Sequence, residues 1–331
     1  MKIAFFEIKG WESDYLKKEL KDHSAEFFET PLTAEYSGPS DVEIVSIFVY
    51  SKIDKDVLDK LPNLKLVTTR STGFDHIDIE ECKKRNIAVS NVPFYGENTV
   101  AEHTFGLILS LSRNIHTAYV RTLRQDYSIE GLKGFDLKGK TIGIIGGGHI
   151  GLHVVRAAKS FGMNALVYDT SHNDFMAEVL EFTYVPLEEL LSKSDVITLH
   201  VPENKFTHHL INKESIGLIK KGAILINTSR GGIIDTDALI EALDKKILAG
   251  VGLDVLEGEE LIKEEKQLLA DPKKAEAFGQ IAKDHVLLSK DNVVFTPHIA
   301  FYSQEALERI LDTTTQNIVD FLEGKLDNMI K

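Results

Sequence analysis

Short runs of apolar, β-branched residues alternate along the chain with amphipathic stretches. The apolar runs are nearly continuous in Val, Ile and Leu, which is typical of strands that are buried on both faces of a parallel sheet. The alternation therefore predicts an α/β protein in which helices cover parallel sheets. The runs fall into two series, and the expected strands are Lys2–Phe6, Glu43–Tyr50, Leu64–Arg70 and Ile87–Val92, then Thr141–Gly146, Ala165–Asp169, Val196–Val201, Ala223–Thr228 and Gly250–Val255.

Two long helices are expected outside these series. Thr99 and Glu102 have the spacing of a capping box directly before the apolar run Phe105–Leu111, which predicts a helix that begins at Thr99. The other helix is expected to follow Ser303 and to end near Gly324. The stretch 257–291 is rich in Glu, Lys and Ala, and we expect a surface helix with a loop, a solvated insertion rather than a lid.

Acidic residues outnumber basic ones, and the formal net charge is −13 with a pI near 5.4. General binding to nucleic acid or to anionic membranes needs clustered Lys and Arg, so this balance argues against both kinds of partner. The single cysteine, Cys82, excludes an internal disulfide and a multi-cysteine metal site, and its charged neighbours predict a bystander on a helix. The N-terminus does not resemble a signal peptide, and no run of about 18 apolar residues occurs. We therefore expect a reduced, cytoplasmic protein.

A glycine-rich turn follows the expected strand at Thr141. Gly146, Gly148 and Gly151 form a G-x-G-x-x-G that runs into a helical stretch, and Asp169 ends the next strand. In such a unit the glycines allow a tight turn and close approach to a pyrophosphate, while the acid accepts hydrogen bonds from a ribose 2′-hydroxyl. Because Asp169 would repel a 2′-phosphate and no Arg follows it, the sequence favours NAD over NADP.

Three further residues suit hydride transfer to a 2-keto acid. Arg230 follows an apolar strand, at the end where ligands of open α/β sheets bind, and a guanidinium can hold a carboxylate by two parallel hydrogen bonds. The alternative is a surface Arg in a salt bridge. His298 is a suitable proton donor near neutral pH, and a carboxylate such as Glu259 would stabilise its imidazolium. Spacing alone does not show whether Glu259 and His298 touch.

The order of the glycine motif, Arg230, Glu259 and His298 resembles that of the D-isomer-specific 2-hydroxyacid dehydrogenases, most closely the branch that acts on D-lactate. The resemblance covers essentially the whole chain and includes several further motifs. These are 70–78 (RSTGFDHID), 91–95 (NVPFY), 101–103 (AEH), 200–202 (HVP) and 296–302 (TPHIAFY).

The resemblance implies a role for each matching residue. Arg230 would bind the substrate carboxylate, His298 would be the general acid/base, and Glu259 would hold and charge His298. On the substrate side it implies backbone contacts at Thr72 and Gly73, and a pocket lined by Tyr95 and Phe301. On the cofactor side it implies Gly146, Gly148, His149, Ile150, Gly151, Asp169, Val201, Pro202, Thr207, Thr228 and, near the nicotinamide amide, Asp254.

The resemblance also implies two Rossmann-like or flavodoxin-like domains and a homodimer built largely through the helix after Thr99. The substrate domain would comprise residues 1–100 and 299–331, with an NAD domain of residues 101–298 inserted into it. Ser229 stands where the family commonly has Ala, and Gly147 adds flexibility to the phosphate turn. Neither departure removes a chemical group.

The implied activity is the reversible NADH-dependent reduction of pyruvate to D-lactate. Alternatives are a dehydrogenase for 2-hydroxyisocaproate or for glycerate and hydroxypyruvate, and, more remotely, a non-enzymatic NAD(H)-binding regulator like the corepressors of this fold. Formate dehydrogenases carry Gln where Glu259 stands. No metal is expected, because the pairs 75–76 (Asp-His) and 208–209 (His-His) lack convergent ligands.

Overall fold

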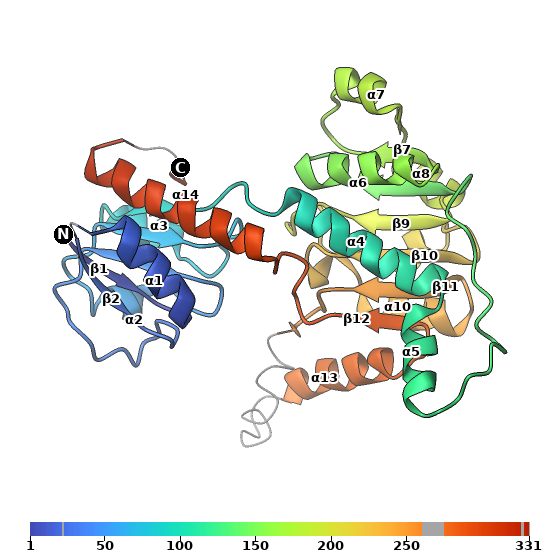
Figure 1. Ribbon diagram of the computed structural model, residues 1–331, viewed down its shortest axis with the longest axis horizontal. Coiled ribbons are helices and arrows are strands. Elements are labelled where there is room, and N and C mark those ends of the chain that lie inside the picture. The colour runs from blue at the N-terminus through green and yellow to red at the C-terminus, as the bar shows by residue number, and fades with distance from the viewer. Residues whose placement is uncertain (22, 260–274, 326–327, 331) are drawn as a thin grey trace. The chain divides into compact units, whose positions relative to one another are not determined.

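The computed structural model describes residues 1–331 except 22, 260–274, 326–327 and 331. The described chain forms two compact units (Figure 1): unit 1 comprises Met1–Tyr95 and Tyr302–Lys331, and unit 2 comprises Gly96–Phe301. The structure thus divides the chain at 95/96 and 301/302, where the sequence-based boundaries are 100/101 and 298/299. Each unit has its own sheet of parallel strands, which confirms the predicted α/β class.

Unit 1 contains a five-stranded parallel sheet. Its order is β2 (Ser24–Phe27), β1 (Lys2–Phe5), β3 (Ile44–Ile47), β4 (Leu66–Thr69) and β5 (Ala88–Ser90). Four of these strands lie in the expected apolar runs. The edge strand β2 was not predicted, because its half-exposed Ser-Ala-Glu-Phe sequence lacks a continuous apolar run. The chain leaves β1 toward β2 and returns on the other side to β3, so the strand order reverses beside β1, where ligands of such sheets bind.

Helices cover both faces of this sheet. On one face α1 (Gly10–Glu19) and the C-terminal α14 (Gln304–Leu322) pack beside each other (Figure 1). The other face is covered by α2 (Lys55–Leu58) and α3 (Ile79–Lys84). Ser303 caps α14 as expected, by accepting from the amide of Ala306. Cys82 is fully buried in α3, and this burial raises the pKa of its thiol to about 11, so the thiol stays protonated at neutral pH.

Unit 2 contains a seven-stranded parallel sheet. Its order is β12 (Val293–Phe295), β11 (Leu248–Leu253), β10 (Ala223–Asn227), β9 (Val196–Leu199), β6 (Thr141–Ile145), β7 (Asn164–Tyr168) and β8 (Thr183–Tyr184). The two edge strands, β8 and β12, are short and were not predicted. The order reverses between β6 and β9, directly beside the glycine-rich turn that follows β6.

The helices of unit 2 lie on both faces of its sheet. They are α4 (Glu97–Ser112), α5 (Ile115–Leu123), α6 (His149–Ser160), α7 (Asp174–Leu180), α8 (Leu187–Lys193), α9 (Lys213–Ile216), α10 (Thr236–Asp244) and α13 (Ala275–Leu288), with a 3₁₀ turn at Gly231–Ile233. The helices α4 and α6 share one apolar core with strands β6, β9 and β10, and α8 and α10 pack in the core on the opposite face.

Two expectations about helices need correction. The helix α4 begins at Glu97 with Gly96 as its N-cap. Thr99 is the third residue of this helix and is buried, so the predicted capping box at Thr99 is wrong. The described part of the stretch 257–291 is not wholly solvated, because α13 buries Ile281 and Leu287. The remainder of the expected loop, 260–274, lies outside the described residues.

Candidate active site

His298 and Glu259 are in contact. The Nδ1 atom of His298 lies 2.7 Å from Oε1 of Glu259, and both side chains are half-buried. Because Nδ1 is engaged by the carboxylate, exchange of a proton with a substrate has to use Nε2. His298 also adopts a left-handed backbone conformation with φ of 54°, which is uncommon for a residue with a side chain. Such conformations are held by surrounding contacts and concentrate at functional sites.

The contacts that hold His298 come from Asp254, the residue that follows β11. The backbone N–H of His298 donates to the Asp254 carbonyl at 2.8 Å. The Asp254 carboxylate accepts from the amides of Ile299 and Ala300 at 2.9 and 2.8 Å, and from the Thr296 hydroxyl at 2.5 Å. Burial raises the pKa of this fully buried carboxyl, but the hydrogen bonds outweigh burial and keep the pKa below its usual value. The charged Asp254 is therefore an anchor for the loop that carries His298.

His103 belongs to the same network and was not predicted as a site residue. It projects from α4, with Nε2 2.9 Å from the Thr296 hydroxyl and 3.4 Å from Oδ1 of Asp254. In the sequence, only the Ala-Glu-His motif at 101–103 pointed to His103. A motif on a helix does not show that its histidine contacts Thr296, which is 193 residues further along the chain.

Arg230 lies in a turn that the buried Asn227 shapes. The Asn227 side chain donates to the Arg230 carbonyl at 2.8 Å and accepts from the amide and hydroxyl of Ser229. The Arg230 guanidinium donates to the Ser229 carbonyl at 2.8 Å, and in the part of the chain that the structure describes it forms no ion pair with a carboxylate. The structure therefore disfavours the surface salt bridge and leaves a half-buried cation suited to an anionic ligand.

The turn after β6 suits a dinucleotide. Gly146 has φ of 105°, and a Cβ there would lie 2.5 Å from the His200 carbonyl, so only glycine fits. A Cβ on Gly148, which caps α6, would meet nothing within 4 Å, so this side of the turn is open to a ligand. The Asp169 carboxylate accepts from the Gly147 amide at 2.7 Å and from the Ser171 amide at 2.9 Å, which joins the acid to the turn. These features fit a pyrophosphate at the start of α6 and a ribose at Asp169.

The other expected cofactor residues lie at the start of α6 and in the loops that follow β9 and β10. His149 and Ile150 form the start of α6. Thr228 follows β10 and its hydroxyl lies 3.1 Å from that of Thr104. The loop after β9 contains Val201, Pro202 and Thr207, and the Thr207 hydroxyl closes it by donating to the Pro202 carbonyl at 2.5 Å.

In unit 1 the expected substrate residues follow the carboxyl ends of β4 and β5. The Thr72 hydroxyl donates to the Val92 carbonyl at 2.8 Å, which joins the two strand ends, and Gly73 follows directly. The Tyr95 carbonyl accepts from Nε of Arg309 at 2.6 Å. The remaining expected substrate residue, Phe301, ends unit 2, and its ring packs edge-on against His298 with centroids 6.4 Å apart.

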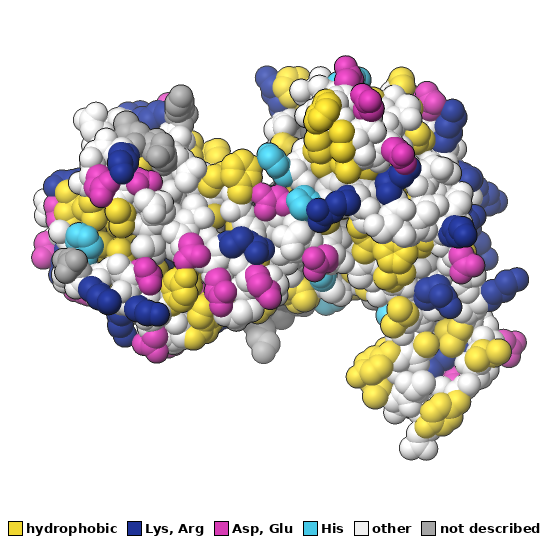
Figure 2. All heavy atoms as spheres, turned by 45° about the horizontal axis from the view of Figure 1, so that its top comes forward, with side chains coloured by type: hydrophobic (Ala, Val, Ile, Leu, Met, Phe, Trp, Pro, Cys, Tyr) yellow, Lys and Arg dark blue, Asp and Glu magenta, His cyan; other side chains and the backbone are white. Residues whose placement is uncertain are grey.

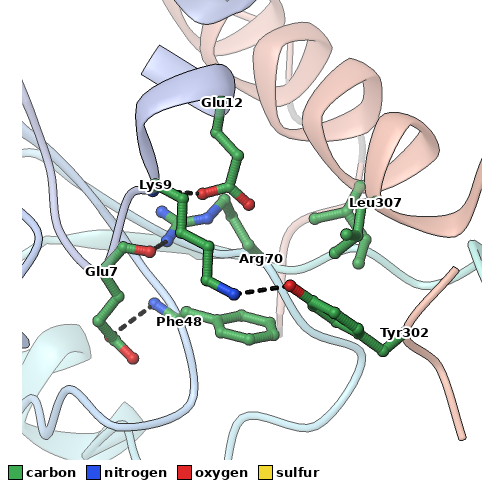
Figure 3. A pocket seen from close by; sticks show the side chains of 8 residues that line it. Glu7, Lys9, Glu12, Phe48, Arg70, Tyr302 and Leu307 are labelled. Atoms are coloured by element: carbon green, nitrogen blue, oxygen red, sulfur yellow. Dashed lines mark hydrogen bonds between the residues drawn. The ribbon is translucent and has the colours of Figure 1, made fainter. Parts of the chain in front are cut away.

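A small pocket in unit 1 contains none of these residues (Figure 3). The pocket has a volume of about 50 Å³, and the Lys9 ammonium spans it to donate to the Tyr302 hydroxyl at 2.6 Å. Arg70 is buried behind it and donates to the carbonyls of Phe6 and Glu7. A volume of this size holds about one or two waters, so the pocket is a packing feature of unit 1 rather than a substrate site.

A parallel α/β unit with a glycine-rich turn, a strand-end acid and a histidine–carboxylate pair defines a nucleotide-dependent oxidoreductase. Residues 105–300 match the family model "D-isomer specific 2-hydroxyacid dehydrogenase, NAD binding domain". The chain belongs to the family of D-isomer-specific 2-hydroxyacid dehydrogenases, and it is an NAD-dependent oxidoreductase.

Three similar proteins illustrate the range of this family. The D-lactate dehydrogenase of Escherichia coli K12 is 37% identical over 331 residues, with 98% of each chain covered. The crystal structure of D-lactate dehydrogenase from Aquifex aeolicus, complexed with NAD and lactic acid, has a TM-score of 0.86 and 38% identity, and the match covers 99% of this chain and 98% of that one. The structure of a D-2-hydroxyisocaproate dehydrogenase has a TM-score of 0.84 and 31% identity, and covers 100% and 99%.

Two structural features are absent from the described residues. Their His, Cys, Asp and Glu side chains form no group of three or more that could hold a metal ion. Among these residues, no helix is both long enough and apolar enough to span a bilayer.

Proposed function

We propose that this protein reduces pyruvate to D-lactate with NADH and a proton, and catalyses the reverse oxidation. The observation that carries the proposal is the 2.7 Å contact of His298 with Glu259, in a chain whose similar proteins include two D-lactate dehydrogenases. A 2-keto acid needs a carboxylate-binding cation and a proton donor, and Arg230 and His298 supply these groups.

The proposed mechanism assigns one task to each side chain. When bound, NADH would supply the hydride for the carbonyl carbon. Arg230 holds the substrate carboxylate through its guanidinium, while His298 donates its Nε2 proton to the carbonyl oxygen and Glu259 stabilises the imidazolium beforehand. In lactate oxidation the neutral His298 takes the hydroxyl proton at the same atom.

The other expected residues complete the proposed site. On the substrate side, the backbone at Thr72 and Gly73 contributes to carboxylate binding, and Tyr95 and Phe301 contact the small methyl end of the substrate. For the cofactor, the glycine turn with His149 and Ile150 binds the pyrophosphate and Asp169 binds the adenosine ribose. The remaining residues proposed to contact the cofactor are Val201, Pro202, Thr207 and Thr228. The carboxylate of Asp254 is fully buried and accepts three hydrogen bonds from its own chain, so we assign it to holding the His298 loop rather than to the nicotinamide amide.

The assay is the loss of NADH absorbance with pyruvate, 2-ketoisocaproate and hydroxypyruvate in parallel. We expect the highest kcat/KM with pyruvate. A preference for 2-ketoisocaproate would favour the 2-hydroxyisocaproate alternative, which the similarity to such an enzyme supports. A preference for hydroxypyruvate would favour a glycerate enzyme, and no turnover with any keto acid would favour a regulator.

We also propose that unit 1 is the substrate domain, that unit 2 is the NAD domain, and that the protein is a cytoplasmic homodimer. The dimer is supported by α5 and the segment after it, on which large apolar side chains are exposed (Figure 2, lower right). They include Tyr119, Leu123, Tyr127 and Ile129, of which Ile129 is 86% exposed. An apolar group of this kind on one protruding segment is typical of an interface. We expect twice the chain mass by light scattering, and a monomer for Leu123→Glu.

A further inference from the structure

Two histidines in the loop after β9 lie stacked and each contacts a different glutamate. The rings of His208 and His209 have centroids 4.0 Å apart. His208 Nδ1 lies 3.1 Å from Oε1 of Glu203, within the same exposed loop. His209 Nε2 lies 2.6 Å from Oε1 of Glu257, which is 48 residues away along the chain. Only the second contact connects the loop to the segment that contains Glu259.

Glu257 is held at three points. Besides the contact with His209, its carboxylate accepts from the hydroxyl of Thr236 at 2.8 Å and from the Thr236 amide at 3.3 Å. Burial raises the pKa of this half-buried carboxyl, but the hydrogen bonds from His209 and Thr236 outweigh burial and keep the pKa below its usual value. Glu257 is therefore a charged anchor two residues before Glu259.

The turn after Arg230 lies against the same anchor. A Cβ on Gly231 would lie 2.0 Å from the Leu256 carbonyl oxygen and 2.4 Å from the Glu257 amide nitrogen, so the two backbones are in direct contact. The His209 amide donates to the Gly232 carbonyl at 2.9 Å. His209 thus bonds to the Arg230 turn through its backbone and to the Glu259 segment through its ring. Its φ of 50° shows that it keeps this position in an uncommon backbone conformation.

We propose that the contact between His209 and Glu257 positions the Arg230 turn and the Glu259 segment relative to each other, so that His209 and Glu257 are positioning residues for the reaction. The inference rests on the proposed roles of Arg230, Glu259 and His298. Neither His209 nor Glu257 contacts a reacting atom in this proposal. Catalytic groups have to be held to within about 0.5 Å of their working geometry, and a charged hydrogen bond between their supporting segments provides that restraint.

The test uses the full-length protein and two matched variants, His209→Phe and His208→Phe. Phenylalanine keeps the stacked ring but cannot bond to a carboxylate. We expect His209→Phe to lower kcat/KM for pyruvate by about 10–100-fold, since a misplacement of catalytic groups by about 1 Å can cost about 10²-fold. The pH at which pyruvate reduction reaches half its maximal kcat/KM should also fall, because a displaced Glu259 stabilises the protonated His298 less. His208→Phe should keep both properties within about twofold, and Glu257→Gln should behave like His209→Phe.

Hydrogen exchange provides a readout that does not depend on activity. His209→Phe should speed exchange at the amides of 256–259 and leave the β6 strand Thr141–Ile145 unchanged. Faster exchange together with an inactive wild type would overturn the proposed function, but it would still show that His209 restrains the segment 256–259. An active wild type with equal kcat/KM, pH profile and exchange in the two Phe variants would overturn the positioning role. A general loss of folding in His209→Phe would show as a lower Tm and faster exchange throughout unit 2, and Glu257→Gln then decides by the same three measurements.

Discussion

The carbonyl of Asp254 accepts the backbone N–H of His298 at 2.8 Å, and the carboxylate of Asp254 binds the next two amides of the same loop. The residue that follows β11 therefore holds the backbone of the proposed acid/base, while Glu259 contacts its ring. The backbone of His298 is held by Asp254 and its ring by Glu259, and the two contacts can be tested separately.

Asp254→Asn should destabilise the protein by about 1–3 kcal/mol, because one of the two buried acceptors becomes a donor that faces a backbone amide. The control is Asp244→Asn, which removes an exposed ion pair with Lys290 and should cost under about 1 kcal/mol. The pKa of Asp254 is depressed in the folded protein. The wild type should therefore have a higher free energy of unfolding than Asp254→Asn at neutral pH, and this difference should shrink as the pH falls below about 4. Urea denaturation at pH 7 and pH 3.5 measures both effects, and an equal difference at the two pH values would contradict this account.

His298→Gln should lower kcat for pyruvate reduction by about 10²–10⁴-fold, since the side chain that delivers the proton is lost. NADH binding, followed by fluorescence titration, should stay unchanged. Turnover at the wild-type rate in this variant would remove His298 from the mechanism.

Arg230→Lys should raise the KM for pyruvate by about 10–100-fold, because an ammonium lacks the two parallel donors of the guanidinium and loses on the order of 1.5–3 kcal/mol of binding. Steady-state kinetics at saturating NADH measures the change. Arg113→Lys, which makes the same exchange at an exposed position, is the matched control and should leave KM unchanged. An unchanged KM in Arg230→Lys would contradict the proposed carboxylate contact.

NADPH should be at least about 100-fold poorer than NADH in kcat/KM, because the Asp169 carboxylate repels a 2′-phosphate. Asp169→Ala should reduce this preference chiefly by weakening NADH. It also removes the acceptor for the Gly147 amide, which loosens the turn that would bind NADH. The assay compares the two cofactors at saturating pyruvate, and equal efficiency in the wild type would refute the assignment of Asp169.

Asp284→Asn should stabilise the protein above pH 6. Asp284 is fully buried in α13, and burial raises the pKa of its carboxyl to about 6. Because the pKa of this carboxyl is raised in the folded state, its ionisation destabilises the protein. The loss of stability develops as the pH rises from about 4 to 6, and above pH 6 it is on the order of 1–3 kcal/mol. Unfolding at pH 8 should show the gain and unfolding at pH 4 should not. The absence of a gain at pH 8 would mean that the charge is compensated in the folded state.

The class of fold and the position of the glycine turn after β6 could be predicted because both depend on short-range patterns. A continuous apolar run such as Val196–Val201 has to be buried on both faces, and the turn at Gly146 needs a conformation and a close contact that only glycine permits. The edge strand β2 was missed because it is half-exposed, so polar residues cost it little stability and its sequence shows no continuous apolar run. The start of α4 was misplaced because Thr99 has the residue type of a cap, whereas burial, which decides its role, is not a local property.

The sequence by itself determined two series of parallel strands covered by helices, and it supplied candidate residues for binding NAD and for 2-keto acid chemistry. Only the tertiary structure decided which of these residues meet: Glu259 with His298, Asp254 with the loop that follows Thr296, and His209 with Glu257. The physical reason is that strands placed side by side in a sheet bring together loops that are far apart in the chain, and spacing along the sequence carries no information about that order. His103 shows this most clearly, because a helix near residue 100 supplies the side chain that contacts Thr296.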